Sequence, residues 1–587
     1  MPALEPLVQR FLDELFVLAP DLATRVGDHR YDDRWPDFTE TGRRARLAFV
    51  DRWEAELGGL DAVSLTPGDR IDRDLLLGEL AEFRFNEEEL REETWNPLVW
   101  VYLLGGGIHP LLAREFAPLH VRLASAAGRL EGIPAVIQAA SDTMGAHPDR
   151  PVATLMAEIA AKRIGGVADL AREAIEIGEA AAAAGDAETA VVLPRLRSAA
   201  AIATAALEGI GRHLAEQVVP NVTGSPLLGP ELFARRLRHT MRDPDVTPAH
   251  ILERAEHEYA AVRAEMVRIA REIWPQWCPG EPEPDDEGVL VRRVLDAIAV
   301  DHPAAGELVS WSQDELARVE AFCRERDVIG LVDEPLTIDW TPVFLRSYAG
   351  AMLDSPGPLD HGQKTFFSIT PVPEEWPADQ QESYLREMNT RQMQLLVIHE
   401  AVPGHYLQGA YANHGSSLAR RVFVSGLFAE GWAVYVTQVM LDRGYCADDR
   451  ALWLNHWKFY LRVVTNAIID VRIHTMGMTT DEAITFMVDG GFQERGEAIA
   501  KDERARLSST QLSTYFLGSL GMWDIEDAMR RRAAVAAGAA ADDVPAPRVV
   551  GGYPTTPGFN ERAHLEAVIS HGAPPISILR RIMLGDG

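Results

Sequence analysis

Apolar residues recur every three or four positions through most of the 587 residues, and this spacing constrains the fold more than any other feature. Residues 248–273 show it most clearly: Thr247 stands at the N-cap position, Pro248 follows at the first helical position, and apolar side chains then mark one face. Strand-like segments are short, at 331–345 and 364–372, where aromatic and β-branched residues lie between prolines and glycines. The sequence therefore predicts a mainly α fold with one small β-sheet.

The length allows three or more domains, or one large elaborated domain. Because the strand signal begins near residue 331, we expect a helical N-terminal region over residues 1–330 and a second region, carrying the sheet, over residues 331–587. The chain shows no internal repeat and no long low-complexity tail. We predict that the two regions form one continuous structural unit.

Charge and cysteine content exclude some classes of protein. The chain has 88 acidic and 57 basic residues, a formal net charge of −31, which repels nucleic-acid backbones and anionic membranes. Three widely spaced cysteines, Cys278, Cys323 and Cys446, form no CxxC pair, which favours a reducing compartment. We identify no signal sequence and no apolar run approaching the ~20 residues of a membrane helix. We therefore expect a cytoplasmic protein that binds neither nucleic acid nor membrane.

One segment, Leu395–Gln408, combines residues typical of a metal site. An apolar run leads to His399 and Glu400, and His405 follows six residues after the first histidine. Zincins carry two zinc-binding histidines on one helix, with a glutamate that takes a proton from the attacking water. In a regular helix six residues rotate the second histidine about 240° from the first, so Pro403–Gly404 must break or bulge the helix to reunite them. The alternative is a helix end with two incidental histidines.

A second segment supplies a third candidate ligand. Glu430 is the one acidic residue in the apolar helical pattern of residues 427–436. A carboxylate on a buried face is unfavourable unless it is ionised beside a cation or a metal. Two histidines and a glutamate match the ligand set of catalytic zinc, which leaves one position for water. The alternative is a salt bridge between Glu430 and a buried arginine.

These motifs resemble the domain-of-unknown-function 885 family, which is similar to zincins of the thermolysin and thimet-oligopeptidase type. The family pattern His-Glu-Ala-x-Pro-Gly-His-x-x-Gln is matched by His399–Gln408, and Glu-Gly-Trp-Ala-x-Tyr is matched by Glu430–Tyr435. Pro20–Gly27 and Ser368–Pro371 also resemble the family, so the likeness covers nearly the whole chain. The resemblance implies a large helical zincin-like fold with a small sheet beside the active-site helix, and peptidase-like chemistry with one Zn²⁺ per chain.

The resemblance also suggests which residues assist the reaction. Asp470 and His474 stand four positions apart, so the carboxylate can orient the imidazole. In related zincins a histidine or a tyrosine donates to the oxyanion, for which His474 is the first candidate and Tyr515, in a Tyr-x-x-Gly element, the second. Arg462 and Arg472 are candidates to bind a substrate carboxylate or to pair with Asp470. A buried polar network without a catalytic role is the alternative for all of these residues.

Two functional hypotheses follow. In the first, the chain is a zinc metallopeptidase in which His399, His405 and Glu430 hold the metal and Glu400 is the general base. Its substrates are short peptides or peptide-like molecules, and Phe367 lies in an edge strand that pairs with them. In the second, the chain is a non-catalytic metal- or peptide-binding protein with a vestigial zincin site.

Overall fold

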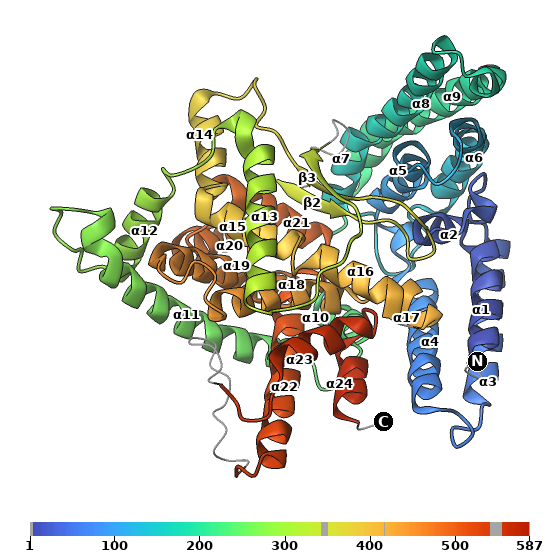
Figure 1. Cartoon of the computed structure of the whole chain (residues 1–587). Helices are drawn as coiled ribbons and strands as arrows, with labels where there is room; N and C mark the ends of the chain where they lie inside the picture. Colours follow the sequence, from blue (N-terminus) through green and yellow to red (C-terminus); the bar gives the residue numbers. More distant parts are fainter. Residues whose placement is uncertain (1–3, 342–349, 416, 541–554, 586–587) are drawn as a thin grey trace. The chain divides into compact units, whose positions relative to one another are not determined.

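The computed structural model describes residues 4–341, 350–415, 417–540 and 555–585 (Figure 1). The chain is mostly helical with one small sheet, as predicted, and it divides into two compact units. Unit 1 comprises residues 1–226 and 356–364, and unit 2 comprises residues 227–355 and 365–587.

Unit 1 is built from helices, coloured blue to teal in Figure 1. In chain order they are α1 (Glu5–Leu18), α2 (Pro20–Val26), α3 (Glu40–Gly58), α4 (Pro67–Phe85), α5 (Leu98–Ala113), α6 (Leu119–Thr143), α7 (Thr154–Arg163), α8 (Gly165–Ala183) and α9 (Ala187–His213). The stretch Ala187–Asn221, which contains α9, is long and apolar enough to cross a membrane by length and composition, although no such run was expected. Within unit 1, α9 packs along α6 and α8 as part of a helical bundle.

Unit 2 contains the sheet and the remaining helices. The strands are β1 (Leu336–Trp340), β2 (Ala351–Asp354) and β3 (Thr365–Ile369). The helices are α10 (Pro230–Met241), α11 (Pro248–Trp277), α12 (Glu287–Ile298), α13 (Leu308–Glu325), α14 (Ala378–Glu387), α15 (Thr390–Glu400), α16 (His405–Gly415), α17 (Leu418–Val422), α18 (Gly426–Asp442), α19 (Arg450–Met476), α20 (Thr480–Thr485), α21 (Arg495–Leu507), α22 (Leu512–Ala536), α23 (Glu561–Ser570) and α24 (Ile576–Leu584).

The division between the units differs from the boundary expected near residue 330. The predicted helix over 248–273 is confirmed as α11, and the Thr247 hydroxyl accepts its capping hydrogen bond from the His250 N–H. Helix α11 packs along the buried helix α19, which belongs to unit 2. Burial of apolar faces between helices distant in sequence therefore places the compact boundary at residues 226/227.

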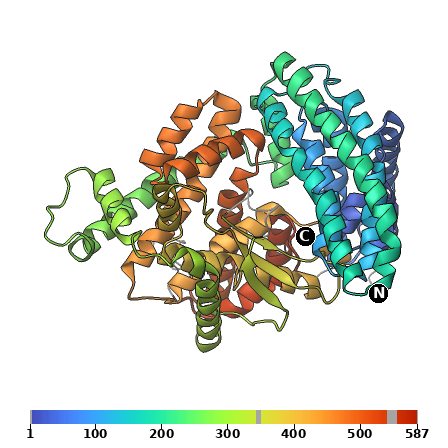
Figure 2. The same ribbon diagram turned by 90° about the horizontal axis from the view of Figure 1, so that it is seen from above.

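The sheet has the order β1-β3-β2, with β1 parallel and β2 antiparallel to β3. Figure 2 shows the chain from above, with the strands drawn as arrows. The predicted strand at 364–372 is confirmed as β3, and that at 331–345 corresponds to β1, with 342–345 outside the described residues. Because β3 is the central strand, both of its edges are already hydrogen-bonded. Phe367 is completely buried, so its predicted role beside an edge-bound peptide is wrong, since alternation of side chains along the strand places it in the core.

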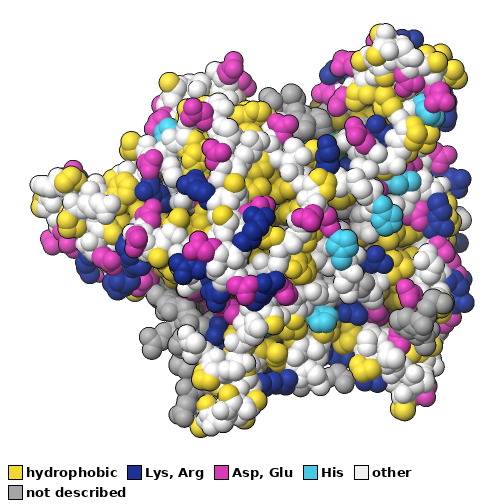
Figure 3. Space-filling model, in the orientation of Figure 1, with side chains coloured by type: hydrophobic (Ala, Val, Ile, Leu, Met, Phe, Trp, Pro, Cys, Tyr) yellow, Lys and Arg dark blue, Asp and Glu magenta, His cyan; other side chains and the backbone are white. Residues whose placement is uncertain are grey.

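Helix α13 packs against both β1 and α15 and so links the sheet to the helix that carries His399. Charged side chains of both signs are interspersed over the face drawn in Figure 3. The residues drawn in colour there form no large patch of a single sign.

Candidate metal centre

The chain breaks its helix between His399 and His405. Helix α15 ends at Glu400, and α16 begins at His405. Between them the Gly404 N–H donates a 3.0 Å hydrogen bond to the Ile398 carbonyl, and a Cβ on Gly404 would lie only 1.8 Å from the His399 carbonyl oxygen. Glycine is therefore required at residue 404, and the predicted break at Pro403–Gly404 is confirmed.

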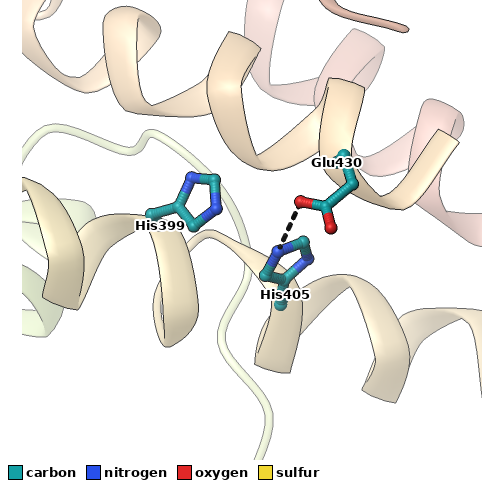
Figure 4. A group of neighbouring side chains, drawn as sticks. All are labelled: His399, His405 and Glu430. Atoms are coloured by element: carbon teal, nitrogen blue, oxygen red, sulfur yellow. Dashed lines mark ion pairs between the residues drawn. The ribbon is translucent and has the colours of Figure 1, made fainter. Parts of the chain in front are cut away.

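The break brings two imidazoles together beside a carboxylate (Figure 4). The ring centroids of His399 and His405 lie 4.8 Å apart, and His405 Nε2 lies 3.5 Å from a carboxylate oxygen of Glu430. One potential ligand atom from each of the three residues lies within 4.8 Å of the others. We call His399, His405 and Glu430 the candidate metal centre.

The segment around Glu430 is positioned by its neighbours in α18. A Cβ on Gly431 would lie 2.3 Å from the backbone of Gly518, so only glycine allows α18 to approach α22 this closely. The Trp432 indole N–H donates a 2.9 Å hydrogen bond to the Pro403 carbonyl, which ties α18 to the helix break. The Glu-Gly-Trp motif therefore supplies one candidate ligand and two contacts that hold this ligand in place.

Burial and mutual charge set the protonation of the candidate ligands. Burial lowers the pKa of His399 to about 3, so its imidazole is neutral, and its buried Nδ1 has no hydrogen-bond partner. Burial alone would raise the pKa of Glu430, but the hydrogen bond and charge of His405 outweigh it and lower the pKa. A neutral imidazole with an unused nitrogen, a second imidazole and an ionised carboxylate are the donor set that Zn²⁺ prefers. The residues present thus fit the metal that the sequence predicts.

Glu400 follows the first histidine and carries no partner of its own. Burial raises the pKa of its carboxyl to about 6. Among the described residues, nothing donates a hydrogen bond to this carboxylate or forms an ion pair with it. Glu400 is therefore free to exchange a proton near neutral pH.

Tyr515, the second oxyanion candidate, lies at the centre. Arg504 donates a 3.2 Å hydrogen bond to its hydroxyl oxygen, and the charge of Glu430 acts on the same hydroxyl. Burial and the charge of Glu430 raise the pKa of Tyr515, which keeps its proton in place. The structure therefore places this tyrosine beside the candidate ligands.

Arg462 also lies close to the centre, but its charge is already paired. Its guanidinium lies over the Phe459 ring, which contacts His399 with ring centroids 5.5 Å apart. Arg462 forms ion pairs with Glu497 at 2.6 Å and Glu387 at 3.6 Å. A substrate carboxylate would have to compete with both glutamates.

Helix α21 brings two cations to this region that sequence reasoning missed. Arg504 contacts Tyr515, and burial followed by the charge of Arg462 lowers the pKa of Lys501 to about 8. Glu430 is among the charges that act on Lys501. The spacing of Glu497, Lys501 and Arg504 along one helical face is the signal that identifies them.

His474 and Arg472 lie away from the candidate metal centre. His474 therefore cannot donate to the oxyanion there, and Arg472 cannot bind a substrate carboxylate there. His474 is fifteen residues beyond Phe459 on α19, or about 22 Å along the helix. Its Nδ1 accepts from the Leu228 N–H, and its Nε2 lies 2.9 Å from the Ala505 carbonyl, so both nitrogens have backbone partners. Arg472 pairs with Glu256 at 2.8 Å. The distance along α19 separates both residues from the candidate metal centre, and His474 belongs to a buried polar network.

Two solved structures are similar over their full length. A "putative lipoprotein of unknown function" from Shewanella oneidensis has a TM-score of 0.79 and 29% identity, with 98% of each chain covered. A "putative lipoprotein" from Colwellia psychrerythraea has a TM-score of 0.78 and 16% identity, covering 99% of this chain and 98% of that one. The second likeness shows a shared fold only. No curated protein matches the chain.

A family model agrees with the motifs that surround the candidate metal centre. The model described as "Bacterial protein of unknown function (DUF885)" matches residues 20–583, which include both histidines, Glu430 and nearly all of units 1 and 2. The chain belongs to the DUF885 family of bacterial proteins.

Proposed function

We propose that the protein is a zinc-dependent peptidase that hydrolyses amide bonds in short peptides. The observation that carries this proposal is the convergence of His399, His405 and Glu430 within 4.8 Å, next to a carboxylate, Glu400, that has no partner among the described residues. A structural metal site needs no such free carboxylate. A hydrolytic site needs one as its general base.

Each residue at the centre has its own role in the proposed reaction. A bound Zn²⁺ would polarise the scissile carbonyl and make water more acidic. Glu400 takes the proton from the attacking water and passes it to the leaving amine, a transfer suited to a carboxyl with a pKa of about 6. Tyr515 donates its hydroxyl proton as a hydrogen bond to the oxygen that becomes negative, and Arg504 orients the tyrosine.

The zincin-like fold and the preference for short peptides belong to the same proposal. The side chains of His405 and Glu430 are 17% and 22% exposed, so the centre is reached by solvent only in part. A centre recessed among helices favours short, flexible substrates over folded proteins.

Metal content and turnover test the proposal together. Zinc per chain is measured by plasma mass spectrometry for wild type, His405→Ala and Glu400→Gln, and hydrolysis of a short-peptide library is followed by mass spectrometry. We expect about one zinc in wild type and Glu400→Gln, none in His405→Ala, and turnover only in wild type and in the control Glu374→Gln. Zinc binding with equal turnover in wild type and Glu400→Gln would refute the general-base role. Zinc binding without any turnover would favour the non-catalytic alternative.

A further inference from the structure

Unit 2 contains a second polar site, a cavity of about 750 Å³ formed by residues of α11, α18, α22 and α23 together with nearby loops. We call it the α18–α22 cavity. Its residues on α18 include Gln438 and Asp442, eight and twelve positions beyond Glu430. At 1.5 Å per residue these positions lie about 12 and 18 Å along the helix from the candidate metal centre. The cavity is therefore distinct from that centre.

Two of the arginines that line the cavity, Arg443 and Arg530, form ion pairs with carboxylates of its wall. Arg530 forms ion pairs with Glu526 at 2.7 Å and with Glu561 at 2.9 Å, and Arg443 pairs with Glu561 at 2.6 Å. The Tyr435 hydroxyl also donates to Glu526 at 2.7 Å. These positive charges are thus already neutralised by the wall of the cavity.

Other oxygen acceptors that line the cavity have no cation in close contact. Asp442 forms no ion pair within 4.0 Å among the described residues, and the neighbouring Gln438 side chain lowers its pKa only in part against the effect of burial. The Gln438 side-chain oxygen is buried without a hydrogen-bond partner, although the residue is only 3% exposed. Glu258 accepts from the Tyr460 hydroxyl on one oxygen, while its other oxygen lies 4.0 Å from Arg254. The unused groups are oxygen acceptors, two of them carboxylates.

An excess of acceptors selects a ligand that donates hydrogen bonds and carries positive charge. Among the described residues, the side chains close enough together to hold a metal ion are His399, His405 and Glu430. None of the carboxylates that line the cavity belongs to this group. The volume suits an organic molecule rather than a bare ion. Trp523 and Phe559 also line the cavity and provide aromatic surface for a cation and its alkyl chain.

We infer that the α18–α22 cavity binds a small organic cation with a primary ammonium group, held by Asp442, Gln438 and Glu258. Burial raises the pKa of Asp442 and of Glu258 to about 7, because the charges of Arg530 and Arg254 offset only part of the desolvation. A bound ammonium group supplies the missing charge and satisfies the unpartnered oxygen of Gln438.

Calorimetric titration of the full chain at pH 8 with 1,5-diaminopentane tests this inference, with 1,5-pentanediol as the uncharged probe of the same length. We expect saturable binding of the diamine, none of the diol, and at least tenfold weaker diamine binding in Asp442→Asn. Asp285→Asn removes the same charge from an exposed loop and should leave the affinity within twofold of wild type. His405→Ala should also bind normally, because His405 begins α16 and does not line the cavity.

Three results would overturn the inference. The first is the absence of saturable diamine binding to wild type, and the second is unchanged binding in Asp442→Asn. The third is equal weakening in Asp442→Asn and Asp285→Asn, which would show general attraction to the acidic surface. Circular dichroism confirms that each variant is folded, and Gln438→Met, which keeps the side-chain length, should weaken binding as an independent check.

Discussion

The indole N–H of Trp432 donates a 2.9 Å hydrogen bond to the carbonyl oxygen of Pro403. This bond joins α18, which carries Glu430, to the helix break that separates His399 from His405. Trp432 is completely buried, so no solvent replaces the indole as a donor. The two motifs of the candidate metal centre are therefore coupled by one buried contact.

Trp432→Phe should lower both the stability of the fold and the zinc affinity of the candidate metal centre. The substitution leaves the buried Pro403 carbonyl without its donor, which costs about 1–3 kcal/mol. We expect a lower free energy of unfolding in urea and a weaker zinc affinity in competition with a chelator. Trp311→Phe, at a partly exposed site on α13, is the control. Unchanged zinc affinity in Trp432→Phe would show that the bond does not position the ligands.

Gly404→Ala should abolish zinc binding. Its Cβ would lie 1.8 Å from the His399 carbonyl oxygen, so the backbone between α15 and α16 has to move. Gly409→Ala, in α16, meets no atom within 4 Å and should stabilise the helix by roughly 0.5–1 kcal/mol. Zinc content and thermal midpoint are measured for both variants. Full zinc occupancy in Gly404→Ala would contradict the observed break.

Tyr515→Phe should separate zinc binding from turnover. Removal of one oxyanion donor lowers kcat by roughly 10²–10³-fold in hydrolases that depend on it. We expect this loss with an unchanged KM and one zinc per chain, because Tyr515 is not a ligand in the proposed set. A kcat close to wild type would assign the oxyanion to another donor.

His474→Gln should affect stability and leave turnover intact. Both nitrogens of His474 face backbone groups, and the neighbouring Asp470 accepts from the Thr510 and Ser513 N–H groups at 3.1 Å. Disturbing this buried network costs about 1–3 kcal/mol. The urea midpoint should fall while kcat and zinc content of the folded variant match wild type. A selective loss of kcat would restore His474 as a catalytic residue.

His29 should make unit 1 more stable at acidic than at alkaline pH. Burial alone would lower the pKa of His29, but its contacts with Asp32 at 2.9 Å and Asp360 at 3.0 Å raise the pKa from 6.5 to about 9. The stabilisation is therefore complete below about pH 6.5 and is lost as the pH rises through 9, with an upper bound of about 3 kcal/mol.

The thermal midpoints of wild type and His29→Gln should accordingly differ most at pH 6 and converge near pH 10. His361→Gln removes a nearby exposed histidine and should show no such dependence. A difference that is the same at both pH values would mean that His29 acts through packing on Phe116, with which it stacks, and not through charge.

Local sequence patterns were sufficient to predict the helices and to identify the motifs that carry the candidate ligands. The spacing of apolar residues predicted α11, whose Thr247 cap and buried face follow from that spacing alone. His399, Glu400, His405 and Glu430 were identified because their chemistry is unusual in apolar segments. Helix propensity, capping and side-chain chemistry act over a few residues, so they can be read directly from the chain.

Tertiary structure decided which other polar residues lie close to the candidate metal centre. Arg462 and His474 stand on the same helix, yet only Arg462 lies beside His399, because a rigid helix separates residues twelve positions apart by about 18 Å. Strand order placed Phe367 in a central strand, and packing of α21 brought Lys501 into the charge network around Glu430. These outcomes depend on contacts between segments distant in sequence. The sequence by itself determined the helices and the ligand motifs, and long-range packing decided which side chains surround them.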